Sequence, residues 1–437
     1  MGDEPEVRLW SVDPVTGLWS AAGSLTGHGT DVPHVEVDPA GGRLLTVSLD
    51  DTVIAWDMSP DAGFGTALPG VPDRWIANRP QYVEEAGVVI APTRSGSTAR
   101  APFDRGPDSV GVAATFLDPD TGEVLHQVAL GDTLAGARHG SSVAVSPDGG
   151  LAAVTSGFAT TVLDTRTAEV VGRVVLPTDE VFEGEPLPAR PVWCAGWTPD
   201  GSRLLIGAEG ELASGTGGGL YVIDPATWGV VEQLDVGGAP QVVETSPDRR
   251  TTVVAMANEA SLRVLDADTL EVRRTVELGD EDVQVDLSFS PDGRYLATGG
   301  DNGVLHVLDT RTWEPVWEPV PTTHGFVLQV EWRPDGRTVV ASGEDGTVTL
   351  VDVERGLVRA RPLPGSTEAG LGWAHLAQVP GDELVVLGGP HEGRRYPMEP
   401  SVWLSDVCAV VGRDLTREEW ERYLPGREWR PTCTDLD

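Results

Sequence analysis

Hydrophobic and polar residues alternate along most of the chain in short runs, and each run ends at a turn rich in Gly, Pro and Asp. The clearest unit spans residues 285–309, where Pro291-Asp292-Gly293 separates the first two runs and Asp301-Asn302-Gly303 separates the next two. A period of two residues predicts half-buried antiparallel strands. In the first turn Pro presets φ while Asp and Gly tolerate the bend, so each unit begins with a tight hairpin.

This unit is repeated along the chain. Its Pro-Asp-Gly turn recurs at residues 147, 199, 291 and 334, and degenerate versions occur near residues 39, 85, 247 and 380. These eight turns are about 49 residues apart on average, a period typical of propeller blades. Each unit contains four strands, which we call a, b, c and d. Repetition of such a unit predicts an all-β fold, a single β-propeller of eight blades over residues 1–400.

The two ends of the repeat region predict how the ring closes. Residues 6–12 and 18–25 look like strands c and d with no strand a or b before them, and the last unit has only a weak strand c. We therefore expect the N-terminal strands to complete the last blade and close the ring. Seven blades is the alternative, if the poor unit near residue 85 is not a blade.

After Pro400 the pattern changes to a helical period, with Trp403, Val407 and Val410 on one face. Thr416 and Glu419 form a capping box that predicts a second helix, ended by the Pro-Gly pair at residues 425–426. We expect residues 401–437 to form a short two-helix tail that packs on the propeller.

The first unit resembles a WD40 repeat, because a Gly-His pair at residues 27–28 precedes two strands that end in Trp-Asp at residues 56–57. In that family a His, a Ser, an Asp and a Trp form hydrogen bonds across the blade. The resemblance assigns this structural tetrad to His28, Ser48, Asp50 and Trp56. Other units replace Trp-Asp by Leu-Asp, Ile-Asp or Val-Asp, and residues 220–227 are closer to the repeats of lactonase-like propellers.

The tail resembles the C-terminal end of actinobacterial WD40 proteins, through the spacing of Trp403, Cys408, Trp420, Tyr423 and Cys433. Such regions often follow a signalling ATPase of the STAND type. The resemblance implies a sensor or interaction module of a bacterial signalling system, with an upstream STAND-type ATPase as one partner. The sequence contains no such ATPase, so the alternatives are a free-standing propeller and a fragment of a longer protein.

Composition narrows the function classes. The chain has 437 residues and a formal net charge of −37, so it would repel nucleic acid over most of its surface. It contains no lysine, which excludes a phosphate-loop lysine and a Schiff-base lysine. We see no signal peptide and no apolar run long enough to span a membrane, and we expect a cytoplasmic protein. Cys408 and Cys433 flank the second tail helix and could pair to staple the tail, but that compartment favours free thiols.

Two motifs invite a ligand but fit turns better. The glycine-rich residues 215–219 lie between strands b and c of an antiparallel blade, whereas a dinucleotide site needs a helix N-terminus after a parallel strand. Residues 118–123 carry alternate carboxylates, but the same place in other units reads as a c–d turn, so we favour a turn over a calcium site. The histidines lack metal-ligand spacing, and we expect no cofactor, no metal and no catalytic residue.

Loop lengths predict the binding face. The a–b and c–d turns are short, whereas the long connections at residues 96–111, 178–190, 209–219 and 390–400 are all b–c or d–a loops, which share one face. Long loops on a rigid scaffold commonly bind ligands. Aromatic, Arg and acidic residues within them make up the candidate partner-binding set: Arg100, Phe103, Arg105, Phe182, Glu183, Arg190, Arg394, Arg395 and Tyr396.

The sequence therefore predicts a non-catalytic interaction module for a protein or peptide, and the acidic chain favours a partner with a basic surface. Two alternatives stay open. One is a lactonase-like propeller hydrolase with a metal in the central channel, because such enzymes gather Glu, Asp, Asn or His there. The other is a purely structural subunit that assembles with itself.

Overall fold

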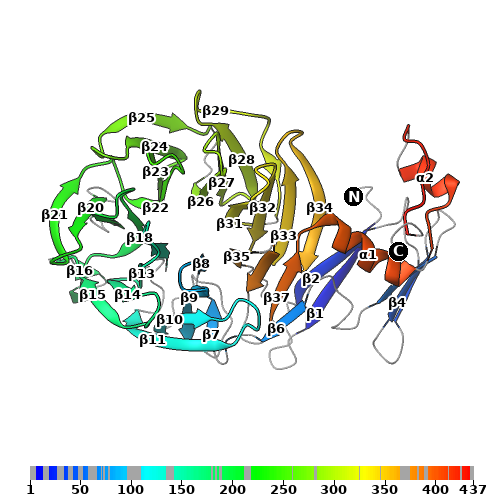
Figure 1. Cartoon of the computed structure of the whole chain (residues 1–437), viewed down its shortest axis with the longest axis horizontal. Helices are drawn as coiled ribbons and strands as arrows, with labels where there is room; N and C mark the ends of the chain where they lie inside the picture. The colour runs from blue at the N-terminus through cyan, green and yellow to red at the C-terminus, as the bar shows by residue number, and fades with distance from the viewer. Residues whose placement is uncertain are drawn as a thin grey trace.

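The protein is a ring of blades around a central channel in a computed structural model (Figure 1). The structure describes residues 6–12, 19–26, 34–37, 43–47, 53–57, 66–69, 71, 74–76, 79–95, 110–133, 142–178, 181–182, 185–186, 189–210, 218–257, 259–279, 283–323, 325–344, 346–364, 375–380, 383–387, 392–411, 413–423 and 426–433.

Within these residues the ring has seven antiparallel blades, which we name A to G in chain order. From the channel outward, blades A to D comprise β8 (Gln81–Val83), β9 (Val88–Ser95), β10 (Val110–Leu117) and β11 (Val124–Thr133); β12 (Val143–Val145), β13 (Leu151–Thr155), β14 (Thr160–Asp164) and β15 (Val170–Val174); β18 (Val192–Trp197), β19 (Leu204–Ala208), β20 (Gly219–Asp224) and β21 (Gly229–Leu234); and β22 (Pro240–Thr245), β23 (Thr251–Met256), β24 (Ser261–Asp266) and β25 (Val272–Glu277).

Blades E to G comprise β26 (Gln284–Phe289), β27 (Tyr295–Gly300), β28 (Val304–Asp309) and the short pair β29 (Glu314–Pro315) and β30 (Val320–Pro321); β31 (Val327–Trp332), β32 (Thr338–Gly343), β33 (Thr347–Asp352) and β34 (Leu357–Pro364); and β35 (His375–Val379), β36 (Glu383–Leu387), β37 (Glu392–Pro397) and β6 (Thr66–Pro69). A further short strand, β7 (Arg74–Ile76), also pairs with β9.

An N-terminal strand closes the ring, but not the one that the sequence predicts. β6 pairs antiparallel with β37, so the outermost strand of blade G comes from before blade A. Strands β1 (Glu6–Val12) and β2 (Trp19–Thr26), which we expected in the last blade, instead pair with each other. β3 (His34–Val37), β4 (Arg43–Val47) and β5 (Val53–Asp57) form a separate three-stranded sheet.

The prediction of eight blades is therefore wrong, and so is the reason given for seven. The poor unit near residue 85 is blade A, with its a–b turn between β8 and β9. The WD40-like first unit lies outside the ring instead, because its fourth strand, β6, pairs with blade G.

The repeated Ser-Pro-Asp-Gly turn is held by its own polar groups. The Ser290 hydroxyl donates to Asp292 Oδ1 (2.7 Å) and accepts the N–H of Tyr295 (2.9 Å). Blades B and D repeat both bonds, through Ser146 and Ser246. The hydrogen bond from Ser290 keeps the pKa of Asp292 below its ordinary value. These turns thus use most of their polar groups internally.

The expected c–d turn at residues 118–123 is confirmed. Asp118 Oδ1 accepts the N–H groups of Asp120 (2.9 Å) and Thr121 (2.8 Å). The same pair of bonds recurs at Asp164 and Asp266, so the first carboxylate of each motif serves the backbone of its turn.

Neighbouring blades share their hydrophobic cores. One cluster joins β13 of blade B to β18 and β19 of blade C, and another joins β27 of blade E to β31 and β32 of blade F. Tryptophan side chains reinforce both junctions: Trp197 Nε1 donates to Ala144 O (3.1 Å) and Trp332 Nε1 donates to Ser288 O (2.9 Å). Each blade therefore supplies part of the hydrophobic core of the next blade.

The tail has the two expected helices, α1 (Pro400–Val411) and α2 (Arg417–Tyr423). Trp403 of α1 packs against the core cluster that contains Tyr396 and Met398. The capping box is confirmed, because Glu419 N–H donates to Thr416 Oγ1 (3.2 Å) and Thr416 N–H donates to Glu419 Oε2 (2.8 Å). No helix in the described part of the chain is both long and apolar enough to cross a membrane.

The expectation of free thiols in the tail is wrong, because Cys408 and Cys433 form a disulfide. Asp414 Oδ1 accepts the N–H groups of Thr432 (2.7 Å) and Cys433 (2.6 Å), which turns the chain end back toward α1. The two cysteine Cα atoms thereby lie 5.3 Å apart, within disulfide range. Cys194 is buried, and burial raises its pKa to about 12.

Thiol counting tests this arrangement. Native protein purified without reductant should show no reactive thiol, denatured protein one, and denatured and reduced protein three, because Cys194 is buried and the other two are bonded. Two or more thiols in denatured, unreduced protein would contradict the disulfide.

Truncation tests the seven-bladed ring. Deleting residues 1–57 removes β1 to β5 and should change Tm by less than about 3 °C, because the ring keeps all of its strands. Deleting residues 1–72 also removes β6 with its buried Leu68 and should lower Tm by at least about 5 °C. Loss of cooperative unfolding in the shorter deletion would show that β1 to β5 belong to the ring.

Candidate functional site: the central channel

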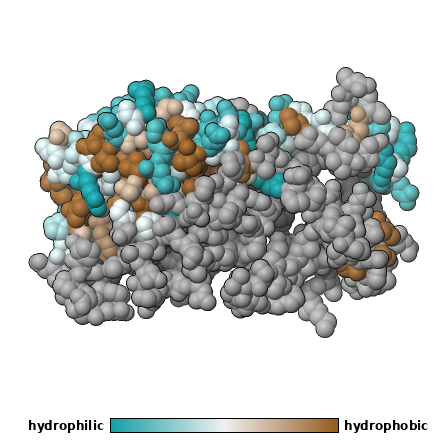
Figure 2. Space-filling model, turned by 90° about the horizontal axis from the view of Figure 1, so that it is seen from below, coloured by the Kyte–Doolittle hydropathy of each residue, from teal (hydrophilic) through white to brown (hydrophobic). Residues whose placement is uncertain are grey.

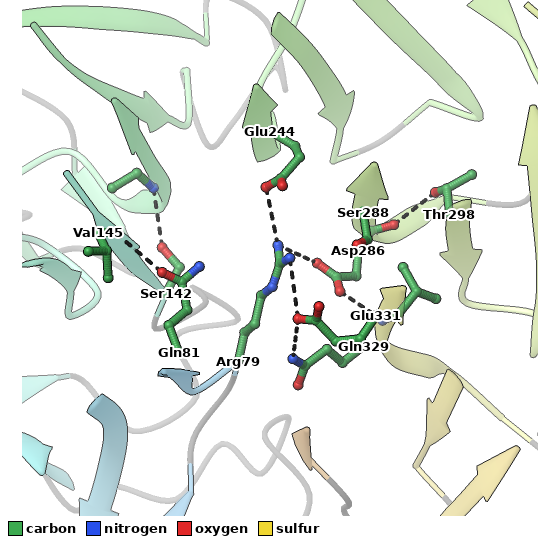
Figure 3. A network of polar contacts seen from close by, with 12 residues as sticks. Arg79, Gln81, Ser142, Val145, Glu244, Asp286, Ser288, Thr298, Gln329 and Glu331 are labelled. Carbon is green, nitrogen blue, oxygen red and sulfur yellow. Dashed lines mark hydrogen bonds and ion pairs between the residues drawn. The ribbon is translucent and has the colours of Figure 1, made fainter. Parts of the chain in front are cut away.

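Four charged side chains meet in the central channel (Figure 3). Glu244, Asp286 and Glu331 project from the inner strands β22, β26 and β31, and Arg79 lies just before β8. The three carboxylates stand in inner strands whose other residues are mostly apolar. They can face the channel because successive side chains of a strand point to opposite faces. Arg79 comes from the opposite part of the ring and reaches across the channel.

The guanidinium of Arg79 touches all three carboxylates. Arg79 Nη1 lies 3.1 Å from Asp286 Oδ1 and 3.6 Å from Glu244 Oε2, and Nη2 lies 3.6 Å from Glu331 Oε1. Asp286 is nearly enclosed, with 4% of its side chain exposed, whereas Glu244 and Glu331 are 28% and 21% exposed. A planar cation with several donors suits such a cluster better than a compact ammonium would.

The cluster is electrostatically unbalanced, since one cation faces three carboxyl groups. Burial raises the pKa of Glu244 to about 7 and that of Asp286 to about 6, although Arg79 opposes both shifts. Burial alone would lower the pKa of Arg79, but the carboxylates outweigh it and hold the pKa above its ordinary value. Arg79 is therefore charged at all ordinary pH values, while the charges on Glu244 and Asp286 vary near neutrality.

Arg79 occupies the position between the carboxylates where the lactonase-like alternative would place a metal. Among the residues that the structure describes, no group of three or more His, Cys, Asp or Glu side chains is arranged to hold a metal ion. The described side chains in the channel form ion pairs and hydrogen bonds.

Polar side chains on the inner strands also tie neighbouring blades together. The residue five positions before the turn proline accepts a backbone N–H from the next blade in three junctions. Ser142 Oγ accepts from Ala195 (3.2 Å), Asp286 Oδ2 from Val330 (2.9 Å), and Gln329 Oε1 from Leu376 (2.8 Å). Gln329 Nε2 also donates to Leu376 O (2.7 Å). Asp286 therefore links blades E and F and holds Arg79 at the same time.

Sequence reasoning missed the channel residues. Counting five residues back from each turn proline identifies Ser142, Asp286 and Gln329 as polar residues in the same register. Glu244 and Glu331 share another register, three residues before that proline. Nothing in the sequence places Arg79 near them, because it lies outside the repeated pattern.

The prediction of a binding loop at residues 390–400 is wrong, because residues 392–397 form β37 and α1 begins at Pro400. Tyr396 is fully buried and Arg394 is 6% exposed, so a partner could not reach them. Arg395 pairs with Asp120 (2.9 Å) and with Glu383. The loop interpretation failed because a third strand completes blade G here.

The remaining predicted residues are only partly visible. Arg190 is half-buried, and its Nη1 donates to Glu209 O (3.3 Å). Phe182 lies in the hairpin of β16 (Val181–Phe182) and β17 (Glu185–Pro186). The rest stay predictions: the side chains of Phe182 and Trp56 are not described, and the residues outside the described part are Arg100, Phe103, Arg105, Glu183, His28, Ser48 and Asp50.

Three family descriptions of β-propellers and WD40 domains match parts of the chain, which supports a WD40-like propeller. The description "YNCE-like beta-propeller" matches residues 212–316, and "Anaphase-promoting complex subunit 4 WD40 domain" matches residues 310–375. "WD domain, G-beta repeat" matches residues 19–57, which contain β2 to β5 and lie before the ring. The first two matches overlap at residues 310–316, and the third lies far from both.

Among curated proteins, the chain is similar to THO complex subunit 3 of Arabidopsis thaliana, with 24% identity over 130 residues. The aligned segment covers 29% of this chain and 39% of the plant protein, so it spans well under two thirds of that relative.

The blade ties predict a stability effect. Gln329→Leu keeps the side-chain size but leaves the N–H and C=O of Leu376 without this partner, so the free energy of unfolding should fall by about 2–4 kcal/mol. Denaturant unfolding measures this. Gln233→Leu, at an exposed site on β21, is the matched control and should change stability by less than about 0.5 kcal/mol. Equal effects of both variants would contradict the assigned role of Gln329.

Proposed function

We propose that the chain is a non-catalytic protein-interaction module that binds a protein or peptide on the face that carries its b–c and d–a connections. The observation that supports this is the contrast between the two faces of the ring. On one face, tight a–b and c–d turns satisfy their polar groups internally, as at Ser290 and Asp118. Such turns leave few groups for a partner.

The other face carries the long connections. The β9–β10 connection runs from Ser95 to Val110, the β15–β18 connection contains the β16–β17 hairpin, and the β19–β20 connection runs from Ala208 to Gly219. All three belong to blades A to C and to their junctions. Arg79 enters the channel from this same face, because β8 runs from it toward the a–b turn. Long loops around one mouth of a rigid ring favour recognition there.

Charge and similarity support a protein partner. A net charge of −37 would steer a partner with a basic surface toward the ring. The matched descriptions name a subunit of the anaphase-promoting complex and a subunit of the THO complex, so both similar proteins are parts of assemblies. By its tail, this chain is proposed to serve as scaffold or sensor in bacterial signalling, with a STAND-type ATPase as one partner.

A cytoplasmic location belongs to the same proposal. The Cys408–Cys433 disulfide argues against this location, because disulfides are rare in a reducing cytoplasm. Thiols alkylated in intact host cells test it: after denaturation, three alkylated thiols would support the cytoplasmic location and one would contradict it.

Deletion of residues 99–107 together with residues 180–185, each replaced by a short Gly-Ser link, tests the binding face. Partners captured from host lysate by the intact chain are identified by mass spectrometry, purified and titrated. The deletion should weaken binding at least about tenfold, which is about 1.4 kcal/mol. Tm should stay unchanged, because β9, β10, β15 and β18 keep all of their residues.

The matched control changes the opposite face. Arg250→Ala with Arg294→Ala removes exposed side chains at the a–b turns of blades D and E and should leave the affinity within about twofold. Binding that survives the loop deletion but is lost in this control would place the partner on the other face.

A further inference from the structure

The channel cluster is energetically unfavourable compared with apolar packing at the same positions. Glu244, Asp286 and Glu331 come from three different blades and share one guanidinium. Removing carboxylates from water disfavours their charged forms, and a single cation cannot offset this for all three. Apolar residues at these positions would pack the inner strands as they do in blades B and C, where Ala144 and Gly196 stand in the register of Glu244.

The guanidinium holds a weakly paired strand. Arg79 lies two residues before β8, a strand of only three residues that pairs with β9 through Gln81, Tyr82 and Val83. Most other inner strands have five or six residues. Toward blade B, Gln81 Oε1 accepts the N–H of Val145 at 3.3 Å. The ion pairs of Arg79 therefore tie the shortest part of blade A to blades D, E and F across the channel (Figure 3).

We propose that Arg79 and the three carboxylates form a pH-responsive clamp, which holds β8 and plugs the channel when the carboxylates are charged and loosens when they take up protons. The proposal concerns the ring itself and does not rest on the proposed function. A ring that binds no protein would still show the clamp, and an interaction module could lack it.

The groups that face Arg79 account for the response. Glu244 and Asp286, with pKa values of about 7 and 6, become neutral as the pH falls from about 7.5 to about 5.5 and then attract Arg79 less. Glu331 is its third partner. The neighbouring inner strands contribute His375 and Tyr82, which are neutral over this range, because burial lowers the pKa of His375 to about 4 and raises that of Tyr82.

Global stability and clamp strength should respond to pH in opposite directions. Both carboxyl groups bind protons more tightly in the folded chain than in the unfolded chain, so their contribution to stability is largest at low pH and is lost as the pH rises through 6 and 7. Acidification thus stabilises the whole ring through these groups while it weakens the ion pairs that hold β8. A purely structural ion-pair cluster would lose both together.

Exchange at β8 can be followed separately from unfolding of the whole ring. The described part of the surface in Figure 2 mixes polar and apolar residues. The clamp lies between the inner strands, and only 4% of the Asp286 side chain is exposed. Amide exchange of the 79–95 segment therefore reports on the clamp, and Tm reports on the ring.

The experiment compares the full chain with the variant Glu244→Gln plus Asp286→Asn, which mimics the protonated state without changing side-chain size. Hydrogen exchange is measured by mass spectrometry at pH 7.5 and 5.5 and corrected for intrinsic rates. In the unchanged chain, the protection of amides 81–83 should fall about tenfold on acidification. In the variant it should be low at both pH values, while Tm at pH 7.5 should exceed that of the unchanged chain by at least about 2 °C.

A second variant keeps the result decisive if this one misfolds. Glu331→Gln removes the charge of the third partner and should also lower the protection of amides 81–83 at pH 7.5. The control variant Gln233→Leu, at an exposed site on β21, should leave β8 protected at that pH. The proposal is overturned if protection at β8 is the same at both pH values, or if neutral carboxamides lower Tm and leave β8 unchanged.

Discussion

Each blade buries half of its core against the next blade, and the ring exists only if the last blade meets the first. In this protein β6 closes the ring by pairing with β37. Leu68 and Ile76 also belong to one hydrophobic core with Val89, Val379 and Leu387. The seven-bladed ring follows from that pairing, because the strand that closes blade G is no longer available to the unit before it. The sheet β3–β5 thus stands as a three-stranded remainder of the repeat pattern.

Inside the ring, a few polar side chains connect the blades along the channel. Gln329 pairs with the backbone of the next blade through both its amide groups, whereas Asp286 divides its oxygens between Val330 and Arg79. The first arrangement is satisfied and stabilising. The second carries buried charge that one guanidinium does not balance, which makes it sensitive to protons. One register of the repeat therefore supplies both the structural tie at Gln329 and one member of the channel cluster, Asp286.

The two faces of the ring differ for a related reason. Turns on the a–b and c–d face are short and repeat the same Ser–Asp and Asp–backbone hydrogen bonds, so chain length cannot vary there without loss of these bonds. Connections on the opposite face begin and end on rigid strands and differ in length, and added length there has a small entropic effect. The long β9–β10 and β19–β20 connections join strands at that face, from which Arg79 also enters the channel.

The sequence alone determined the repeat, its turns, the blade architecture, the tail helices and the capping box at Thr416. Each of these depends on residues that are close together in the chain. Tertiary structure decided how many blades close, that Tyr396 is buried in a third strand, that Cys408 meets Cys433, and that Arg79 meets Glu244, Asp286 and Glu331. These are contacts between segments far apart in sequence. A repeat of nearly equal units does not record which one stays outside the ring, since every unit offers similar strands and only the competition between pairings selects one.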